Sequence, residues 1–125
     1  MAGVYDIEIE QGSDTNDIEI YPTEDDGSPI DLSGYTARLQ IRPDVRSETL
    51  YDDLTTENSR IVIESFVENF EETPTTFYKI IIKFPNETTS AYHWVTGVYD
   101  LELYSGTLVD RFLKGTVTTD REVTR

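Results

Sequence analysis

The chain has 125 residues, the size of one domain, and its 37% hydrophobic content is enough to form one folded core. Its 25 acidic and 10 basic residues give a net charge of −15, which disfavours nucleic acid and anionic membranes as partners. The chain has no cysteine, which excludes disulfides and thiolate chemistry, and no segment predicts a membrane helix or a secretion signal, so we expect a soluble protein.

Alternating apolar and polar residues predict β-strands along most of the chain, because successive side chains of a strand point to opposite faces. The alternation runs through VYDIEIE (4–10), DIEIYP (17–22), YTARLQIR (35–42), RIVIES (60–65), TFYKIIIKF (76–84) and GVYDLELY (97–104). A last strand is expected over 107–119. Turn signals such as EDDGSP, DLSG and YSGT separate these runs. The pattern predicts one all-β domain over residues 1–125, folded as a sandwich or a barrel.

Only two segments are expected to contain helix, and neither has a sustained 3.6-residue period. They are NETTSAYHW (86–94), in which Asn86 is a candidate N-cap, and residues 47–56. A third irregular segment, SFVENFEETPTTF (65–77), is predicted to be a long acidic hairpin loop. Its Phe66 and Phe70 are more apolar than a loop that only closes a hairpin requires.

Two nearly identical phrases, VYDIEIE (4–10) and VYDLELY (98–104), carry carboxylates at every second position. Because these carboxylates alternate with apolar residues, we expect them on the solvated face of a strand. A glycosidase instead needs two carboxylates that converge in a cleft, one of them with a raised pKa. The pattern therefore favours a solvated surface over catalysis.

A second acidic group lies in TEDDGSPID (23–31), where clustered oxygen atoms are of the kind that calcium prefers. The candidate metal ligands are Asp25, Asp26 and Asp31, with Glu24 beside them. The order of these residues differs from that of an EF-hand loop, and Asp26–Gly27 is a common turn pair. We therefore prefer a turn without an ion and expect no metal.

No familiar catalytic motif occurs in the chain. His93 is the single histidine, so the usual triads and zinc sites cannot be built, and packing or a surface hydrogen bond is the favoured role. There is no G-x-S-x-G, glycine-rich phosphate loop or H-E-x-x-H, and we expect neither enzyme activity nor a cofactor. The rings of Tyr92, Trp94, Tyr99 and Tyr104 are candidates for a sugar-stacking platform, although tryptophan in a β-sandwich is more often core.

Several phrases spread over most of the chain resemble small β-sandwich proteins of tailed-bacteriophage virions. They are QGSD (11–14), DGSPIDLSGYTARLQIR (26–42), YDLEL (99–103) and GTVTTDREVTR (115–125). The similarity is to the N-terminal module of phage baseplate upper proteins and to related tail or baseplate proteins. It implies an Ig-like antiparallel sandwich of seven to eight strands with Greek-key connections. It also implies a non-enzymatic virion component that docks in symmetric copies on a tail, baseplate, neck or capsid.

The chain departs from this family pattern in two places, the acidic NDIEIYPTEDDG (16–27) and the long aromatic segment 65–77. Because of both departures, the resemblance does not identify which surface would contact a partner. The candidate partner-binding residues are Phe66, Val67, Phe70 and Trp94. The alternative for the two phenylalanines is that they fold back over an open end of the sandwich. The chain ends, residues 1–4 and 120–125, are candidates to pair with a neighbour's sheet edge.

Two functional hypotheses of different class follow. The first is a structural adaptor or decoration protein of a virion, present in several copies and acting through contacts with other virion proteins. The second is a carbohydrate- or calcium-dependent surface-binding module that uses Trp94 and the nearby tyrosines, or the 24–31 loop.

Overall fold

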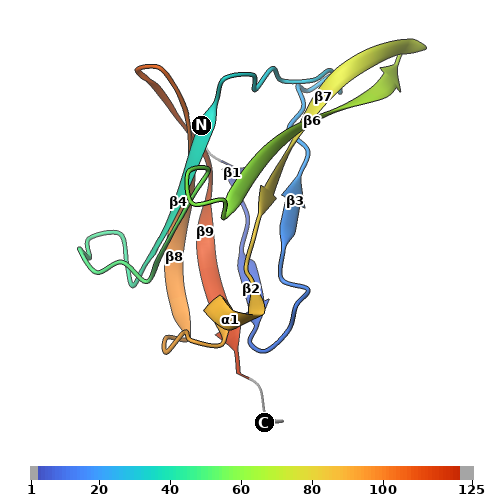
Figure 1. The fold of residues 1–125 in the computed structure, drawn as a ribbon. Coiled ribbons are helices and arrows are strands. Elements are labelled where there is room, and N and C mark those ends of the chain that lie inside the picture. Colours follow the sequence, from blue (N-terminus) through green and yellow to red (C-terminus); the bar gives the residue numbers. More distant parts are fainter. Residues whose placement is uncertain (1–2, 122–125) are drawn as a thin grey trace.

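A computed structural model, which describes residues 3–121, is a sandwich of two β-sheets (Figure 1). The larger sheet has the strand order β1-β9-β8-β4-β5, with β2 also paired to β9, and the smaller sheet has the order β3-β7-β6. The strands of the larger sheet are β1 (Gly3–Val4), β2 (Ile7–Glu10), β4 (Thr36–Arg42), β5 (Asp52–Thr55), β8 (Thr96–Ser105) and β9 (Leu108–Asp120). Those of the smaller sheet are β3 (Ile18–Ile20), β6 (Ile61–Phe70) and β7 (Thr73–Ile82).

The predicted all-β sandwich is confirmed, with nine strands in the described residues where seven to eight were expected. The additional strands are short. The alternation over residues 4–10 is divided into β1 and β2, and residues 47–56, a candidate helix, contain β5 instead. β5 pairs with β4, and Leu54 is its only fully buried side chain, so its sequence shows no alternation.

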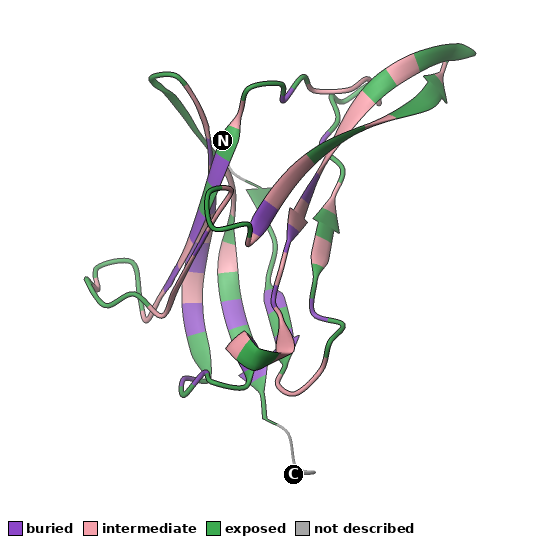
Figure 2. Cartoon of the chain, viewed as in Figure 1, coloured by how far each residue is buried: buried purple, intermediate pink, exposed green. Residues whose placement is uncertain are grey.

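The core lies between the two sheets and consists of the apolar residues that alternate along the strands (Figure 2). In β2, Ile7 and Ile9 are buried whereas Glu8 and Glu10 are exposed. β8 has the same alternation, so the carboxylates of VYDLELY lie on its partly exposed outer face. The repeated acidic phrases therefore lie on solvated surfaces, as predicted. The fully buried residues also include Leu39, Ile41, Leu54, Ile61, Ile80, Ile82, Phe84, Leu101 and Val117.

The N-terminal strands run parallel to the C-terminal strand in one continuous register. Gly3 is opposite Leu113, and Ile7 is opposite Val117, which is the same offset. Asp120, at the end of β9, also pairs within the chain. The predicted pairing of the chain ends with a neighbour concerns in part residues 1–2 and 122–125, which lie outside the described residues.

The connection from β7 to β8 holds α1 (Asn86–Thr89), so the predicted turn over 86–94 is confirmed for its first four residues. The predicted N-cap is wrong: Pro85 occupies that position, and Asn86 is the first helical residue. The carbonyl of Pro85 accepts the N–H groups of Thr88 and Thr89, both at 3.0 Å, which begins the helical hydrogen bonding one residue earlier than expected. Among residues 3–121, no helix has the length and apolar character needed to cross a membrane.

Candidate interaction surface

The segment 65–77, predicted to be a loop, consists mainly of strand. β6 and β7 pair antiparallel over their full length and form, with the turn between them, a hairpin of residues 61–82. β3 pairs with residues 80–82 only. Residues 66–77, which we call the outer ribbon, are therefore two-stranded and project beyond the body of the sandwich (Figure 1).

Glu71 and Glu72 form the two-residue turn at the end of the outer ribbon. Both have left-handed backbone conformations, with φ of 51° and 66°. Two-residue hairpin turns need positive φ, which Asn and Gly adopt most easily. A Glu-Glu pair carries no such signal, and this is why the sequence predicted a long hairpin loop where the structure has paired strands that end in a two-residue turn.

The two phenylalanines of β6 lie on the face of the hairpin that points away from the core. Ile61 and Ile63 of the same strand pack on the core, so the side chains of Phe66 and Phe70 point to the opposite side. The alternative that these rings fold back over an open end of the sandwich is therefore wrong. The strand simply continues past the core, and its alternation keeps the rings on the outer face.

Four aromatic side chains form a continuous row on this outer face, which we call the aromatic row. Phe66 is directly opposite Phe77 of β7, and their ring centroids are 5.8 Å apart. Tyr21 meets Phe66 edge to face at 5.8 Å, and Phe70 meets Phe77 edge to face at 6.3 Å. Such pairs each stabilise by about 0.5–1.5 kcal/mol beyond the area they bury. Sequence reasoning missed Tyr21 and Phe77, because their contacts depend on a strand pairing that it did not predict.

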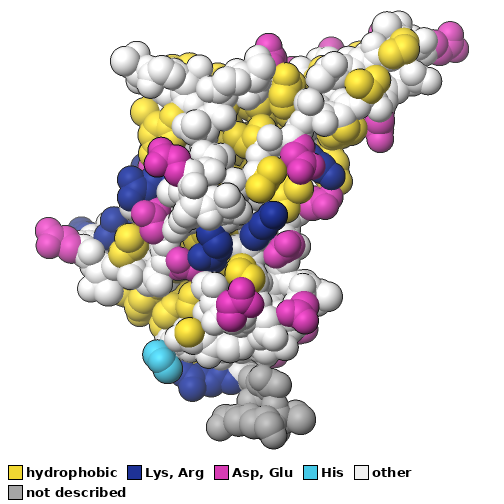
Figure 3. Space-filling model, in the orientation of Figure 1, with side chains coloured by type: hydrophobic (Ala, Val, Ile, Leu, Met, Phe, Trp, Pro, Cys, Tyr) yellow, Lys and Arg dark blue, Asp and Glu magenta, His cyan; other side chains and the backbone are white. Residues whose placement is uncertain are grey.

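The aromatic row is partly open to solvent. Its phenylalanines are partly buried, whereas Tyr21 is 54% exposed. The turn at Gly27 packs on the end of the row, since a β-carbon at that position would lie 3.6 Å from Cε1 of Phe70. Val67 points to the inner face, but it lies beyond the core and is 66% exposed. Figure 3 shows hydrophobic side chains along the hairpin with acidic side chains among them.

The charge of the hairpin is strongly negative. Glu68 lies between Phe66 and Phe70 on the outer face, and Glu71 and Glu72 are exposed at the turn. Lys79 is the one cation of residues 61–82. Its Nζ lies between two carboxylates of the same face, 3.8 Å from Glu64 and 3.9 Å from Glu19.

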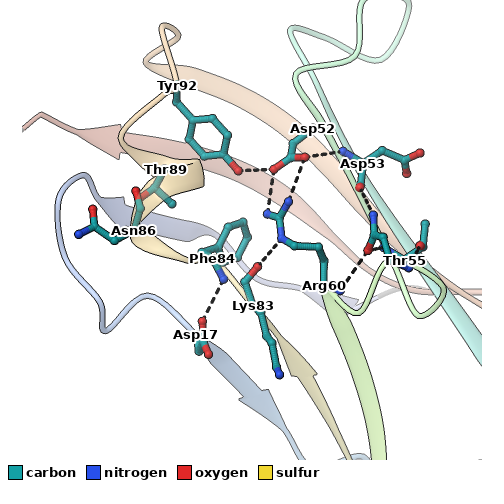
Figure 4. Close-up of polar contacts among 11 residues, drawn as sticks. Asp17, Asp52, Asp53, Thr55, Arg60, Lys83, Phe84, Asn86, Thr89 and Tyr92 are labelled. Atoms are coloured by element: carbon teal, nitrogen blue, oxygen red, sulfur yellow. Dashed lines mark hydrogen bonds and ion pairs between the residues drawn. The ribbon is translucent and has the colours of Figure 1, made fainter.

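A polar network links the base of the hairpin to the larger sheet (Figure 4). The Arg60 guanidinium, directly before β6, donates to both carboxylate oxygens of Asp52 at 2.9 and 3.3 Å, and its Nε donates to the Lys83 carbonyl at 3.0 Å. The hydroxyl of Tyr92 donates to the same carboxylate. The Arg60 and Asp52 side chains are only 17% and 15% exposed, so water screens their attraction weakly.

The network shifts the pKa of two of its members. Burial lowers the pKa of Arg60, but the hydrogen bond and charge of Asp52 outweigh that effect, and the net pKa is raised. Burial, together with the hydrogen bond and charge of Asp52, raises the pKa of Tyr92. Both groups therefore keep their ordinary protonation state at neutral pH. The network acts as a structural link between the hairpin and the larger sheet.

Trp94 lies inside the sandwich and is 9% exposed. Tyr51 stacks on it with nearly parallel rings 4.8 Å apart, and Tyr92 contacts it at 4.7 Å. Of the other proposed platform residues, Tyr99 is buried in the core and Tyr104 lies on the partly exposed outer face of β8. The aromatic rings expected to form one sugar platform are therefore divided between the interior and the surface.

The acidic loop at residues 24–31 forms a turn, with the Gly27 N–H donating to the Glu24 carbonyl at 2.9 Å. Asp26 Oδ1 accepts hydrogen bonds from the hydroxyl and N–H of Ser28 at 2.6 and 2.9 Å. The N–H of Ser33 donates to Asp31 Oδ1 at 2.9 Å.

These hydrogen bonds lower the pKa of Asp26 and of Asp31. Asp25 is exposed beside them. Residues 3–121 contain no group of three or more His, Asp or Glu side chains arranged to hold a metal ion. His93, the remaining candidate for chemistry, is exposed.

The sequence matches no protein-family model, and no curated protein is significantly similar to it.

Proposed function

We propose that this protein is a non-enzymatic structural component of a tailed-bacteriophage virion. It serves as an adaptor or decoration protein of the tail, baseplate or neck. It is present in several symmetric copies and acts through contacts with other virion proteins.

The observation that carries this proposal is the aromatic row on the outer ribbon. A ribbon of two strands that projects from a sandwich adds little to the core, yet it displays rings on one face and Val67 on the other. Partly exposed apolar side chains on an element of this kind support a protein-protein contact. A turn that only connected two strands would need none of them.

The resemblance of the sequence to phage baseplate upper proteins and related tail proteins supports the same function. The phrases that carry the resemblance fall on the sandwich: DGSPIDLSGYTARLQIR leads into and includes β4, and YDLEL lies within β8. The segments that depart from the family pattern, 16–27 and 65–77, meet in the structure, because Tyr21 contacts Phe66 and Gly27 lies beside Phe70. The part specific to this chain is thus gathered at one surface.

The alternative function, binding of carbohydrate or calcium, has less support from the geometry. A sugar stacks on an exposed ring face, whereas Trp94 is buried and its ring faces Tyr51 and Tyr92. The carboxylates of Asp26 and Asp31 accept hydrogen bonds from neighbouring serines. The virion function is therefore preferred.

Cryo-electron microscopy of purified phage particles tests the proposal. We expect density for a small two-sheet sandwich at symmetric positions on the tail, baseplate or neck, with the outer ribbon in contact with a neighbouring protein. Mass spectrometry of the same particles should detect the chain. Intact virions that contain none of this protein would refute the proposal, and a glycan-binding assay with the Trp94→Ala variant would then become the next experiment.

A further inference from the structure

We propose that the aromatic row docks into an apolar cleft bordered by lysine and arginine side chains on a different protein of the particle. This inference rests on the proposed function, and it adds the chemistry of the partner and the face that meets it. The partner is a basic protein surface and not a second copy of this chain.

The outer ribbon needs a partner for physical reasons. A two-stranded hairpin is marginally stable in water unless another element packs on it. β3, the third strand of the smaller sheet, pairs with residues 80–82 only, so residues 66–77 have no third strand beside them. Tyr21 and the turn at Gly27 pack on part of one face. The aromatic row covers one face of the ribbon, and the exposed Val67 lies on the other. Docking would bury apolar area that the free protein leaves in water.

The charge around the aromatic row determines the kind of partner. Glu68 lies within the row, Glu64 precedes it, and Glu71 and Glu72 are at its end, whereas Lys79 is already close to two carboxylates. An apolar surface with an acidic border is complementary to an apolar cleft with a basic border. Nucleic acid and anionic lipid carry the same sign of charge as this border and would be repelled.

A second copy of the chain offers only a groove of mixed charge. This groove lies on the outer face of the larger sheet, where valines and the basic residues Arg42, Arg111 and Lys114 are accompanied by the acidic residues Asp6, Asp100 and Glu102. Each copy carries a net charge of −15, so two copies repel each other. The exposed arginines on the outer face of the larger sheet are paired within the chain: Arg38 with Asp53 at 2.9 Å, and Arg111 with Asp100 at 3.4 Å. Docking onto that face would require breaking these pairs without gaining a net positive surface.

Carbodiimide cross-linking of intact particles identifies the partner's chemistry directly, because the reagent joins a carboxylate to a touching lysine without a spacer. We expect peptides that contain Glu68, Glu71 or Glu72 to be joined to lysines of a different virion protein. Links from these glutamates only to Lys83 or Lys114 of this chain would overturn the inference in favour of a second copy. Glu64 is not informative, because Lys79 lies beside it in the same chain.

Charge reversal within the aromatic row provides the second test. A phage that lacks the gene is supplied with the wild-type protein or a variant during infection, and the copies per purified particle are counted by quantitative mass spectrometry. For Glu68→Lys we expect at least about a tenfold loss of occupancy, the effect of removing a central interface contact. Glu8→Lys is the matched control. It makes the same change of charge at an exposed position of β2, and it should leave occupancy unchanged.

Phe66→Ser tests the apolar part of the contact and should cause a similar loss. If Phe66→Ser fails to fold, the occupancy of Glu68→Lys, a substitution at an exposed position, still tests whether the row docks. Normal occupancy for both Glu68→Lys and Glu8→Lys would overturn the docking inference but leave the protein a virion component, so the proposed function would stand. Absence of the wild-type protein from particles would overturn both.

Discussion

Arg60 shows how a single side chain can connect the two sheets. It lies at the start of the hairpin and pairs with Asp52 of the larger sheet in a partly buried site. Removing one partner of a buried pair leaves the other charge uncompensated. We expect Arg60→Met to lower the free energy of unfolding by about 3 kcal/mol, as measured by urea denaturation.

Arg38 provides a matched control, since it pairs with the adjacent Asp53, but its side chain is 46% exposed. Arg38→Met should lower the free energy of unfolding by about 1 kcal/mol or less, because exposed ion pairs contribute little. Equal losses for the two variants would show that the burial of Arg60 has no energetic role.

Because of Tyr92, the stability of the protein should decrease at alkaline pH. Its pKa is raised above the ordinary value of 10.0 by burial and by Asp52, so the folded state favours the neutral phenol. The stability that Tyr92 contributes is fully present below pH 10 and is lost as pH rises toward the raised pKa. In urea denaturation series from pH 8 to pH 11, wild-type stability should fall more steeply above pH 10 than that of Tyr92→Phe.

Tyr99 remains in both proteins, and burial raises its pKa too, so the variant should keep part of the alkaline slope. Parallel curves for wild type and Tyr92→Phe would contradict the assignment. At neutral pH the variant should lose about 1 kcal/mol, the usual net contribution of one hydrogen bond.

Among the elements, the N-terminal strand depends on a close approach to β9 at Gly115. A β-carbon there would lie 2.1 Å from the carbonyl oxygen of Tyr5, which also accepts the Tyr99 hydroxyl at 2.6 Å. Gly115→Ala must therefore separate the strands locally. We expect a loss of about 1–3 kcal/mol, the cost of overpacking, in the free energy of unfolding.

Gly3→Ala is the control for this strand contact, since the one close neighbour of its β-carbon would be the end of the Leu113 side chain, at 3.3 Å, which can rotate. The Phe112 carbonyl oxygen would lie at an ordinary contact distance of 3.9 Å. Hydrogen exchange should show faster exchange of the Tyr5 amide, which donates to Lys114, in Gly115→Ala but not in Gly3→Ala. Equal protection in both variants would contradict this account.

The hairpin of residues 61–82 could be predicted from the sequence only in part. The alternation of Ile61 and Ile63 predicted the start of β6, and TFYKIIIKF predicted β7, because buried strands show a two-residue period. The outer ribbon has no buried face to create that period, and its Glu71–Glu72 turn lacks Asn and Gly. Sequence reasoning therefore noticed the apolar excess of Phe66 and Phe70 but could not predict the row that they form.

For the whole molecule, the parts that could be predicted are those determined by the core. The sandwich, the solvated carboxylates and the turn at Asp26–Gly27 all follow from local patterns. The Arg60–Asp52–Tyr92 network and the contact of Tyr21 with Phe66 join residues far apart in sequence, and no local pattern specifies such partners. The candidate site depends on these long-range contacts, so only part of it was predictable.

The same separation between core and outer ribbon can be tested by shortening the hairpin. Ser65 and Tyr78 are directly opposite each other in β6 and β7, and a Thr-Asn-Gly-Thr segment can replace residues 66–77 between them. The two threonines then form the hydrogen-bonded pair that an Asn-Gly turn requires. The deletion keeps the core residues of both strands and removes three of the 25 acidic residues. The aromatic contacts are lost, but so is the conformational entropy cost of ordering residues 66–77, which offsets them. We therefore expect the shortened protein to fold with a free energy of unfolding within about 1 kcal/mol of wild type.

The shortened protein should nevertheless be missing from phage particles, because it lacks most of the aromatic row and the acidic turn. Its matched control replaces Glu71–Glu72 alone with Asn-Gly, which keeps the row and removes the left-handed strain of the turn. Urea denaturation and particle occupancy, measured on both proteins, separate folding from docking. A loss of stability of about 3 kcal/mol or more in the shortened protein would make the outer ribbon part of the folding unit. Normal particle occupancy of the shortened protein would show that the outer ribbon is not part of the docking surface.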